Sequence, residues 1–125
     1  MCKKFLVCEK CGNMVDLIND AGAPISCCGQ EMKLMTANTS EGAGEKHLPK
    51  VTVKCKTVTV NVGEVDHPMT DAHRIEWVYL KTTQGGQFKA LKAGDAPVAV
   101  FKLGDEKAVA AYAYCNLHGL WMTEI

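Results

Sequence analysis

Apolar and polar residues alternate over much of the chain after residue 50, which is the pattern of strands that bury one face. In VTVKCKTVTVNVG, residues 51–63, the alternation changes phase between an early and a late set of apolar positions: Val51, Val53 and Cys55, then Val58, Val60 and Val62. Because side chains in a strand alternate with a period of two, this change predicts a bulge or a tight turn near Lys56 and Thr57. The same pattern places Cys55 in a strand, where we expect a core thiol.

Three later segments have strand character, and turn signals separate them. RIEWVYLKT (74–82) alternates, and APVAVFKL (96–103) and AVAAYAYC (108–115) are apolar enough for buried strands. The Ala-rich segment could also be helical on propensity alone. TQGGQF and LGDEK are Gly-containing turn signals, and no segment has a long helical period. Several short strands with frequent turns predict a mainly β fold containing a β-sandwich.

The cysteines divide the chain. Five of the seven lie within residues 2–28. The segment TANTSEGAGEK (36–46) that follows is small, polar and Gly-containing, which is typical of a linker. We therefore expect a boundary near residues 36–38 and two domains, residues 1–36 and 37–125.

Composition narrows the function. Fourteen basic residues balance fourteen acidic ones, which argues against a nucleic-acid-binding module. No apolar run approaches the ~20 residues that span a membrane, and the first residues are too polar for a secretory signal. We therefore expect a cytoplasmic protein without membrane partners. Seven cysteines in a reducing compartment indicate metal binding rather than disulfides.

The first candidate metal cluster is formed by CEKCG and SCCGQ. These motifs supply four thiols: Cys8, Cys11, Cys27 and Cys28. Four thiolates form a tetrahedral site for zinc or iron, and spacing alone favours zinc, with a disulfide as the weaker alternative. Adjacent cysteines can share one metal only where the backbone turns sharply, so we expect a distorted tetrahedron.

The second candidate cluster is scattered along the chain. Its members are the four histidines and one cysteine: His47, His67, His73, His118 and Cys115. A lone histidine is usually a surface or core residue, but loops at one end of a sandwich bring distant segments together. Five such ligands exceed the four of structural zinc. They suit an octahedral metal with one open position, and iron is the first-row candidate for imidazole plus thiolate.

The motifs CEKCGNMV, CCGQEM, GEKHLP, VGEVDHPMTDAHRIEW and CNLHGLW resemble, in order and spacing, those of the desulfoferrodoxins, the two-iron superoxide reductases. The resemblance covers the whole chain and replaces the preference for zinc. It implies a desulforedoxin-like knuckle that binds ferric iron through Cys8, Cys11, Cys27 and Cys28. It also implies an immunoglobulin-like β-sandwich whose second iron has four equatorial histidines and one axial cysteine: His47, His67, His73, His118 and Cys115.

The same resemblance implies an activity and partners. Superoxide would be reduced to hydrogen peroxide at the ferrous centre without production of dioxygen, with electrons from rubredoxin or a similar small donor. Glu45 would occupy the sixth position of ferric iron, and Lys46 would attract the anion; without the resemblance the two read as a solvated charged pair. A homodimer is expected. Whether the tetrathiolate iron relays electrons or is structural stays open.

Three other functions are open from the residues alone. A blue-copper electron carrier would use Cys115, His118 and Met122 with His47, but it leaves His67 and His73 unexplained. A rubredoxin-like carrier or a zinc-ribbon module would use the first cluster and leave every histidine idle.

Aromatic residues lie near the candidate ligands, namely Trp77, Tyr114 and Trp121. We expect core packing for each of them, with shielding of the metal as the alternative. Cys2 is terminal, and we expect no role for it.

Overall fold

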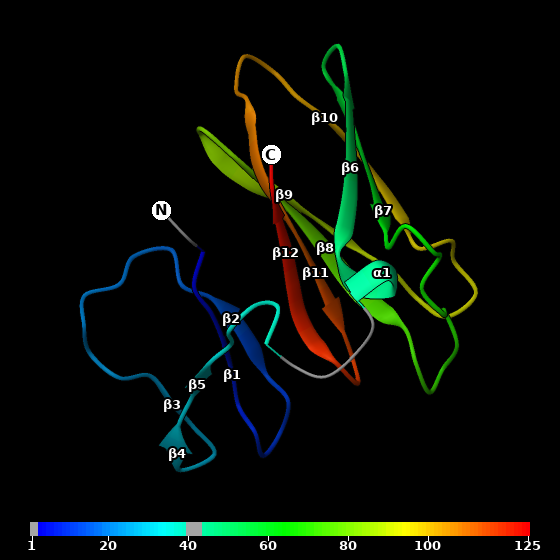
Figure 1. Cartoon of the computed structure of the whole chain (residues 1–125). Coiled ribbons are helices and arrows are strands. Elements are labelled where there is room, and N and C mark those ends of the chain that lie inside the picture. Colours follow the sequence, from blue (N-terminus) through cyan, green and yellow to red (C-terminus); the bar gives the residue numbers. More distant parts are fainter. Residues whose placement is uncertain (1–2, 40–43) are drawn as a thin grey trace. The chain divides into compact units, whose positions relative to one another are not determined.

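The computed structural model describes residues 3–39 and 44–125, and within these the chain is mainly β, as predicted (Figure 1). The chain divides into two compact units, residues 1–36 and 37–125. The prediction for Cys2 lies outside the described residues. Of the described helices none could cross a membrane, since α1 (Gly44–His47) has only four residues.

The first unit is a small Cys-rich knuckle built from short strands. They are β1 (Phe5–Val7), β2 (Met14–Asp16), β3 (Ser26–Cys27), β4 (Gln30–Glu31) and β5 (Lys33–Leu34). Strands β2, β1 and β5 form one antiparallel sheet, and β3 pairs with β4 in a hairpin. Its buried hydrophobic residues among those described are Phe5, Cys8 and Met32. So small a core needs support from a metal or a partner.

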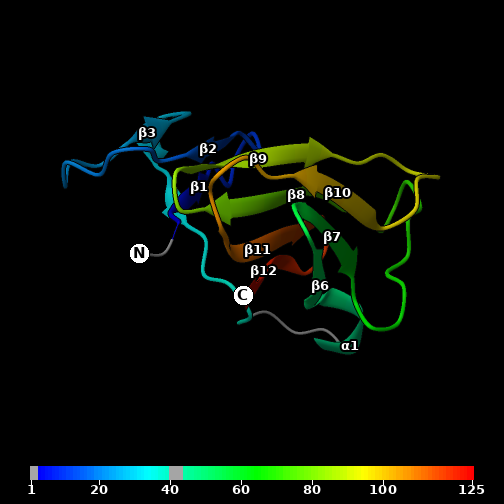
Figure 2. The same cartoon turned by 90° about the horizontal axis from the view of Figure 1, so that it is seen from above.

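The second unit is a sandwich of two antiparallel sheets, which confirms the predicted fold class. Its strands are β6 (Pro49–Lys54), β7 (Thr57–Val62), β8 (Ile75–Thr82), β9 (Gly85–Ala90), β10 (Val98–Lys102), β11 (Ala108–Cys115) and β12 (Gly119–Glu124). One sheet has the order β10-β7-β6 and the other β12-β11-β8-β9 (Figure 2). The core between the sheets includes Val58, Val60 and Val62 of β7 and Val78 and Leu80 of β8.

The Ala-rich segment 108–115 is a strand, because it lies between two others. Strand β11 pairs with β8 on one side and with β12 on the other. Its small side chains Ala111 and Ala113 lie in the core, where they let bulkier residues of the facing sheet pack closely. Tertiary pairing therefore overrides the helical propensity of alanine.

The predicted phase change is a tight turn. Strands β6 and β7 form a hairpin that pairs Lys54 with Thr57, so Cys55 and Lys56 make the turn. The prediction of a buried Cys55 was therefore wrong. The side chain is exposed and its φ is 56°, a left-handed conformation imposed by the turn.

Candidate metal centres

The four thiols of the first cluster converge on one point. Their sulfur atoms all lie within 4.8 Å of one another. Cys8 and Cys11 come from the turn after β1, which is closed by a hydrogen bond from the Gly12 amide to the Cys8 carbonyl (2.8 Å). Cys28 has a φ of 54°, which is the sharp turn that adjacent cysteines need to face the same point.

The electrostatics of this cluster call for a cation. Hydrogen bonds from the backbone amides of Cys11 and Lys10 lower the pKa of Cys8 to about 6. The neighbouring sulfur atoms of Cys11 and Cys8 raise the pKa of Cys28 to about 12. Four thiols this close cannot all lose their protons without a bound cation to balance the negative charge. Zinc and iron would both fit the four sulfur donors. The side-chain amide of Asn13 donates a hydrogen bond to the sulfur of Cys27 (3.6 Å).

The five members of the second cluster also meet, although they come from four separate segments. His47 ends α1, His67 and His73 lie in the loop between β7 and β8, and Cys115 ends β11. Ligand atoms of these four residues lie within 4.8 Å of one another. His118, in the turn before β12, places its Nδ1 atom 3.1 Å from Nε2 of His47 and 3.9 Å from the sulfur of Cys115.

His67 and His73 are arranged as neutral ligands. Nδ1 of His67 donates a hydrogen bond to the Pro68 carbonyl (2.7 Å), so its Nε2 carries a lone pair, directed at Nε2 of His47 3.0 Å away. Nε2 of His73 is buried without a hydrogen-bond partner. Burial lowers the pKa of His67 to about 4 and also lowers the pKa of His73. Converging lone pairs and an orphaned nitrogen fit a metal ion.

One predicted aromatic neighbour lies at this cluster. Trp121 is buried, its ring stacks on that of His47 (centroids 4.9 Å apart), and its indole nitrogen donates to the His118 carbonyl (3.1 Å). Trp121 therefore both packs in the core and covers the cluster, so core packing and shielding of the site occur together in this residue. Trp77 and Tyr114 are half-buried and stack on each other, with centroids 5.6 Å apart.

The charged pair before His47 lies on the helical turn α1. The side chains of Glu45 and Lys46 are both exposed. The charge of Lys46 nevertheless reaches the cluster, because it contributes, after burial and His118, to the lowered pKa of His73. A cation therefore stands near the histidines on a solvent-accessible side.

Gly63 holds α1 in place, which the sequence did not reveal. Its φ is 89°, and an added Cβ would meet the carbonyl oxygens of Lys46 (2.6 Å), Glu45 (2.7 Å) and Val65. The Val65 amide donates to the Glu45 carbonyl (3.0 Å), so the loop that leads to His67 is fixed to the turn that carries His47. A glycine directly after the last buried valine of β7 signals a turn, but not this close approach.

Replacing Gly63 by alanine is expected to destabilise the protein strongly. The left-handed φ costs about 1 kcal/mol for a residue with a Cβ, and the crowding adds about 1–3 kcal/mol. Gly94 is the matched control, since its φ is 90° and a Cβ there would meet nothing within 4 Å. Denaturant unfolding of both variants measures the difference, and equal losses of stability would rule out the close approach as a constraint.

Each of the two units matches a family of known proteins. The family model Desulfoferrodoxin matches residues 39–124, and the model Desulfoferrodoxin, N-terminal domain, matches residues 4–35. The chain is 45% identical to the desulfoferrodoxin of Nitratidesulfovibrio vulgaris over 94% of this chain and 92% of that protein. It is 35% identical to the superoxide reductase of Pyrococcus horikoshii over 72% of this chain and 94% of that protein.

A solved structure is also similar over nearly the full length. The crystal structure of the superoxide reductase from Treponema pallidum matches with a TM-score of 0.84 and 36% identity, over 99% of this chain and 100% of that one. The two family models together span both the Cys-rich knuckle and the sandwich, in the order that the sequence motifs follow. The chain belongs to the desulfoferrodoxin family.

Proposed function

We propose that this protein is a superoxide reductase, which reduces superoxide by one electron to hydrogen peroxide without producing dioxygen. The observation that carries the proposal is the convergence of four histidine nitrogens beside the sulfur of Cys115. Relatives and a solved structure that carry the name superoxide reductase support it. A blue-copper carrier does not account for His67 and His73, which lie in the same cluster.

The proposed ligands of the catalytic iron are His47, His67, His73, Cys115 and His118. Bound iron would supply the electron for superoxide by cycling between the ferrous and ferric states. Five donor atoms leave one of six positions for the substrate. The Cys115 thiolate would donate electron density to the metal, and the Pro68 carbonyl holds the His67 ring in its metal-binding tautomer.

Two exposed residues are proposed to act on the substrate side. Lys46 would raise the local concentration of the superoxide anion, because a cation at the mouth of a site attracts anions. Glu45 would offer a carboxylate, a hard oxygen donor that suits the oxidised ion better than the reduced one. The backbone carbonyl groups of Glu45 and Lys46 lie close to Gly63, so the backbone that carries these two side chains is fixed.

A second, ferric iron is proposed at Cys8, Cys11, Cys27 and Cys28, which makes two irons per chain. Each catalytic turnover consumes one electron, so an external donor is required, and we propose rubredoxin or a similar small protein. Removal of superoxide would serve detoxification. A cytoplasmic location is proposed because a chain rich in cysteines that are used for metal binding suits a reducing compartment.

The test is spectroscopy with metal analysis on the purified protein, followed by superoxide kinetics with a dioxygen electrode. We expect two irons per chain, tetrathiolate absorption as isolated and a separate band after oxidation. Superoxide should disappear with formation of peroxide and no release of dioxygen. One iron per chain with no second band, or dioxygen release, would overturn the proposal.

Replacing Lys46 by alanine is expected to slow the bimolecular reaction with superoxide about 10-fold at low ionic strength, because the attraction is electrostatic. The dependence of the rate on salt should weaken in parallel. Lys50 is an exposed lysine of β6 and provides the matched control for net charge. Pulse radiolysis at several salt concentrations measures both, and equal effects of the two variants would contradict a local role for Lys46.

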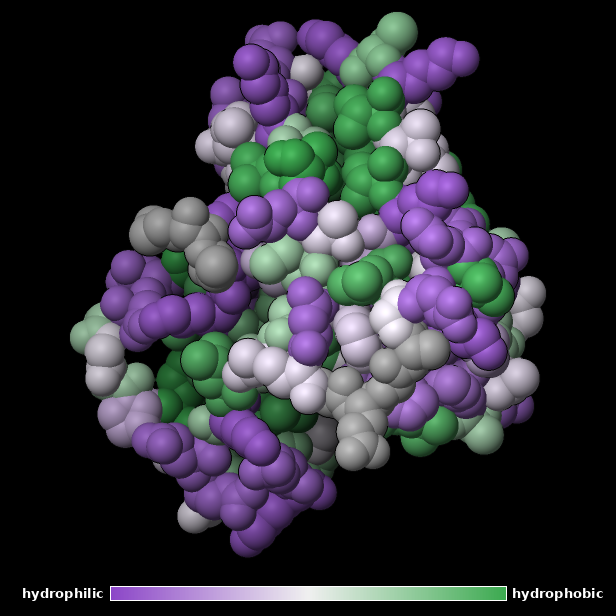
Figure 3. All heavy atoms as spheres, viewed as in Figure 1, coloured by the Kyte–Doolittle hydropathy of each residue, from purple (hydrophilic) through white to green (hydrophobic). Residues whose placement is uncertain are grey.

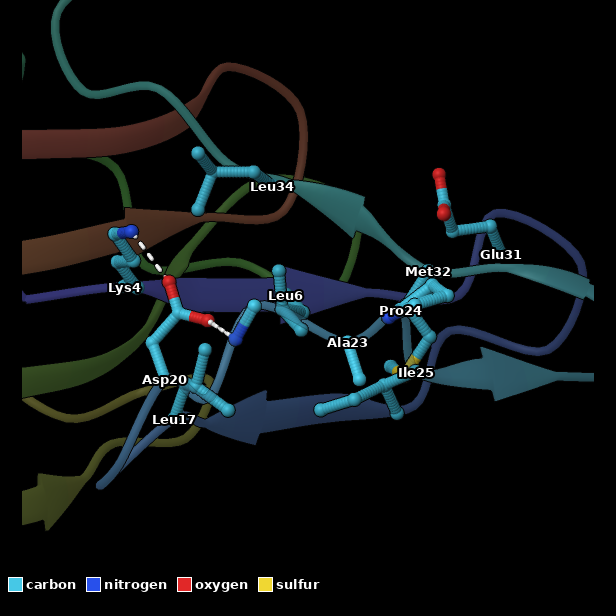
Figure 4. A pocket seen from close by; sticks show the side chains of 11 residues that line it. Lys4, Leu6, Leu17, Asp20, Ala23, Pro24, Ile25, Glu31, Met32 and Leu34 are labelled. Atoms are coloured by element: carbon cyan, nitrogen blue, oxygen red, sulfur yellow. Dashed lines mark hydrogen bonds and ion pairs between the residues drawn. The ribbon is translucent and has the colours of Figure 1, made fainter.

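A homodimer is proposed on the surface of the first unit. A cavity of about 360 Å³ lies among its strands and is lined by apolar side chains that include Leu6, Leu17, Ile25, Met32 and Leu34 (Figure 4). Ile25 and Leu34 remain 36% and 47% exposed. Hydrophobic residues are visible on the surface of the first unit (Figure 3). A second copy of the chain would bury these apolar side chains, which the small core of the unit leaves exposed. Lys4 and Asp20 form an ion pair (2.6 Å) at its rim.

Replacing both Ile25 and Leu34 by glutamate is expected to weaken such a dimer at least about 100-fold, because charges would be buried without partners. Sedimentation equilibrium measures the mass as a function of concentration. Leu117 of the second unit is 60% exposed, and its replacement by glutamate is the control. A monomeric wild-type protein, or a double variant that dimerises as well as the wild type, would contradict this surface.

A further inference from the structure

We propose that Thr70 and Asn116 are positioning residues, which aim His73 at the metal by fixing the peptide groups on both sides of it. The inference rests on the proposed function, since it assumes that His73 is a ligand. It concerns two polar side chains that are not among the proposed ligands and that bind backbone groups.

Thr70 binds the peptide groups of His73 itself. The His73 amide donates to the Thr70 hydroxyl oxygen (3.0 Å), and the same hydroxyl donates to the His73 carbonyl (3.1 Å). The Thr70 amide donates to that carbonyl as well (2.9 Å). The turn from residue 70 to residue 73 is therefore closed by three hydrogen bonds, two of which need the hydroxyl group.

Asn116 binds the residues on either side of His73. Its side-chain nitrogen donates to the Ala72 carbonyl (3.0 Å), and its side-chain oxygen accepts from the Arg74 amide (2.8 Å). Its own amide donates to the Arg74 carbonyl (3.1 Å). Because Asn116 directly follows Cys115, these bonds tie the loop of one ligand to the strand end of another.

The strand pairing explains why a side chain is needed here. Strands β8 and β11 shift register between Tyr114 and Cys115, and their pairing ends at Ile75 and Cys115. A regular ladder would fix Arg74 and its neighbours through backbone bonds alone, but the irregularity interrupts it. The amide of Asn116 continues the connection past this point and determines where the loop containing His73 leaves the sheet.

His73 depends on its backbone more than His67 does. The ring of His67 is oriented by its own hydrogen bond to the Pro68 carbonyl. The Nε2 atom of His73 has no hydrogen-bond partner, and the residue is only half-buried, so packing confines it less. Its ring centroid lies 4.6 Å from that of His67 and 5.2 Å from that of His118. A small movement of residues 72–74 would carry the ring out of this arrangement.

The test compares how fast reduced holoprotein loses iron to a ferrous-iron chelator. The variants are Asn116→Ala, Thr70→Val and, as the conservative rescue, Thr70→Ser. The tetrathiolate absorption of the same sample reports on the other centre and serves as an internal reference. We expect Asn116→Ala and Thr70→Val to release the iron of the histidine centre about 10–100-fold faster, as loss of outer partners of metal ligands usually does. The ferric electron paramagnetic resonance signal should change shape, and Thr70→Ser should restore both properties.

Asn38 supplies the matched control. Its side chain makes the same two kinds of bond, donating to the Met122 carbonyl (3.1 Å) and accepting from the Met122 amide (2.9 Å). Its φ is 62°, a left-handed conformation that alanine adopts less readily than asparagine, so alanine there also lowers stability. Asn38→Ala should therefore lower stability and leave iron release at the wild-type rate.

The outcomes separate the inference from the function. If Asn116→Ala and Asn38→Ala release iron equally fast, Asn116 is only structural and the inference is wrong, while superoxide reduction stands. If Thr70→Ser resembles Thr70→Val, the hydroxyl group does not position His73. If the wild-type protein holds no iron outside the tetrathiolate centre, the proposed function fails, and the positioning role fails with it.

Discussion

Replacing His47 by alanine is expected to empty the histidine centre of iron and to abolish superoxide reduction. His47 is the hub of this cluster. Its Nε2 atom lies 3.0 Å from Nε2 of His67 and 3.1 Å from Nδ1 of His118, and its ring stacks on Trp121. Outer partners of metal ligands alone are worth about 10–100-fold in affinity, so loss of a ligand should cost more than about 100-fold. The side chain is also 2% exposed, so the change leaves a cavity.

Metal analysis and visible spectroscopy measure this effect. The iron content should fall from two per chain to one, with the tetrathiolate absorption unchanged and the second band lost on oxidation. Leu48→Ala is the control, because Leu48 is the exposed neighbour of His47 and should keep both irons. A His47→Ala protein that retains two irons and reduces superoxide at the wild-type rate would refute the ligand assignment.

Replacing Cys8 by serine is expected to unfold the first unit. Cys8 is 1% exposed and is one of only three buried hydrophobic residues among those described in this unit, with Phe5 and Met32. Structural metal sites of this kind contribute about 10–16 kcal/mol of binding free energy in small domains. A core of this size contributes only a few kcal/mol to the free energy of unfolding. It therefore cannot keep residues 3–36 folded without metal.

Limited proteolysis followed by mass spectrometry detects this unfolding. Cleavage within residues 3–36 should become fast, and one iron per chain should remain. Cys55→Ser is the control, because Cys55 is exposed in a hairpin turn, and it should behave as the wild type. Should Cys8→Ser resist the protease as the wild type does, the metal would not be what stabilises the unit. The rate of superoxide reduction by Cys8→Ser, with electrons from a chemical reductant, would also tell whether the tetrathiolate iron is needed for turnover.

The fold was predictable where burial alone sets the pattern. The valines of β7 alternate in the sequence and are buried in the core, as expected for a strand with one covered face. The Ala-rich strand β11 was ambiguous, since its conformation depends on neighbours on both sides. Cys55 was misassigned for a related reason. The apolar alternation of β6 extends onto Cys55, the first residue of the turn, and only the pairing of Lys54 with Thr57 reveals where the strand ends.

The candidate sites were predictable as residue types and spacing, and their supports were not. Cysteine and histidine are few in the chain, and their chemistry limits what they can do together. Gly63, Thr70 and Asn116 belong to common residue types in turn-like segments. Their importance comes from carbonyl and amide groups that tertiary structure brings close, such as the Glu45 carbonyl beside Gly63. A sequence pattern does not encode such approaches locally.

Each candidate metal cluster takes all of its ligand atoms from one unit: the four thiols lie within residues 1–36, and the histidines with Cys115 lie within residues 37–125. A gene that encoded either unit alone would still specify a full set of donors. Fusion, loss or exchange of the knuckle would therefore leave the ligand set of the sandwich complete. In evolutionary terms, the two centres are free to be inherited separately, and selection on one need not constrain the other through shared ligands.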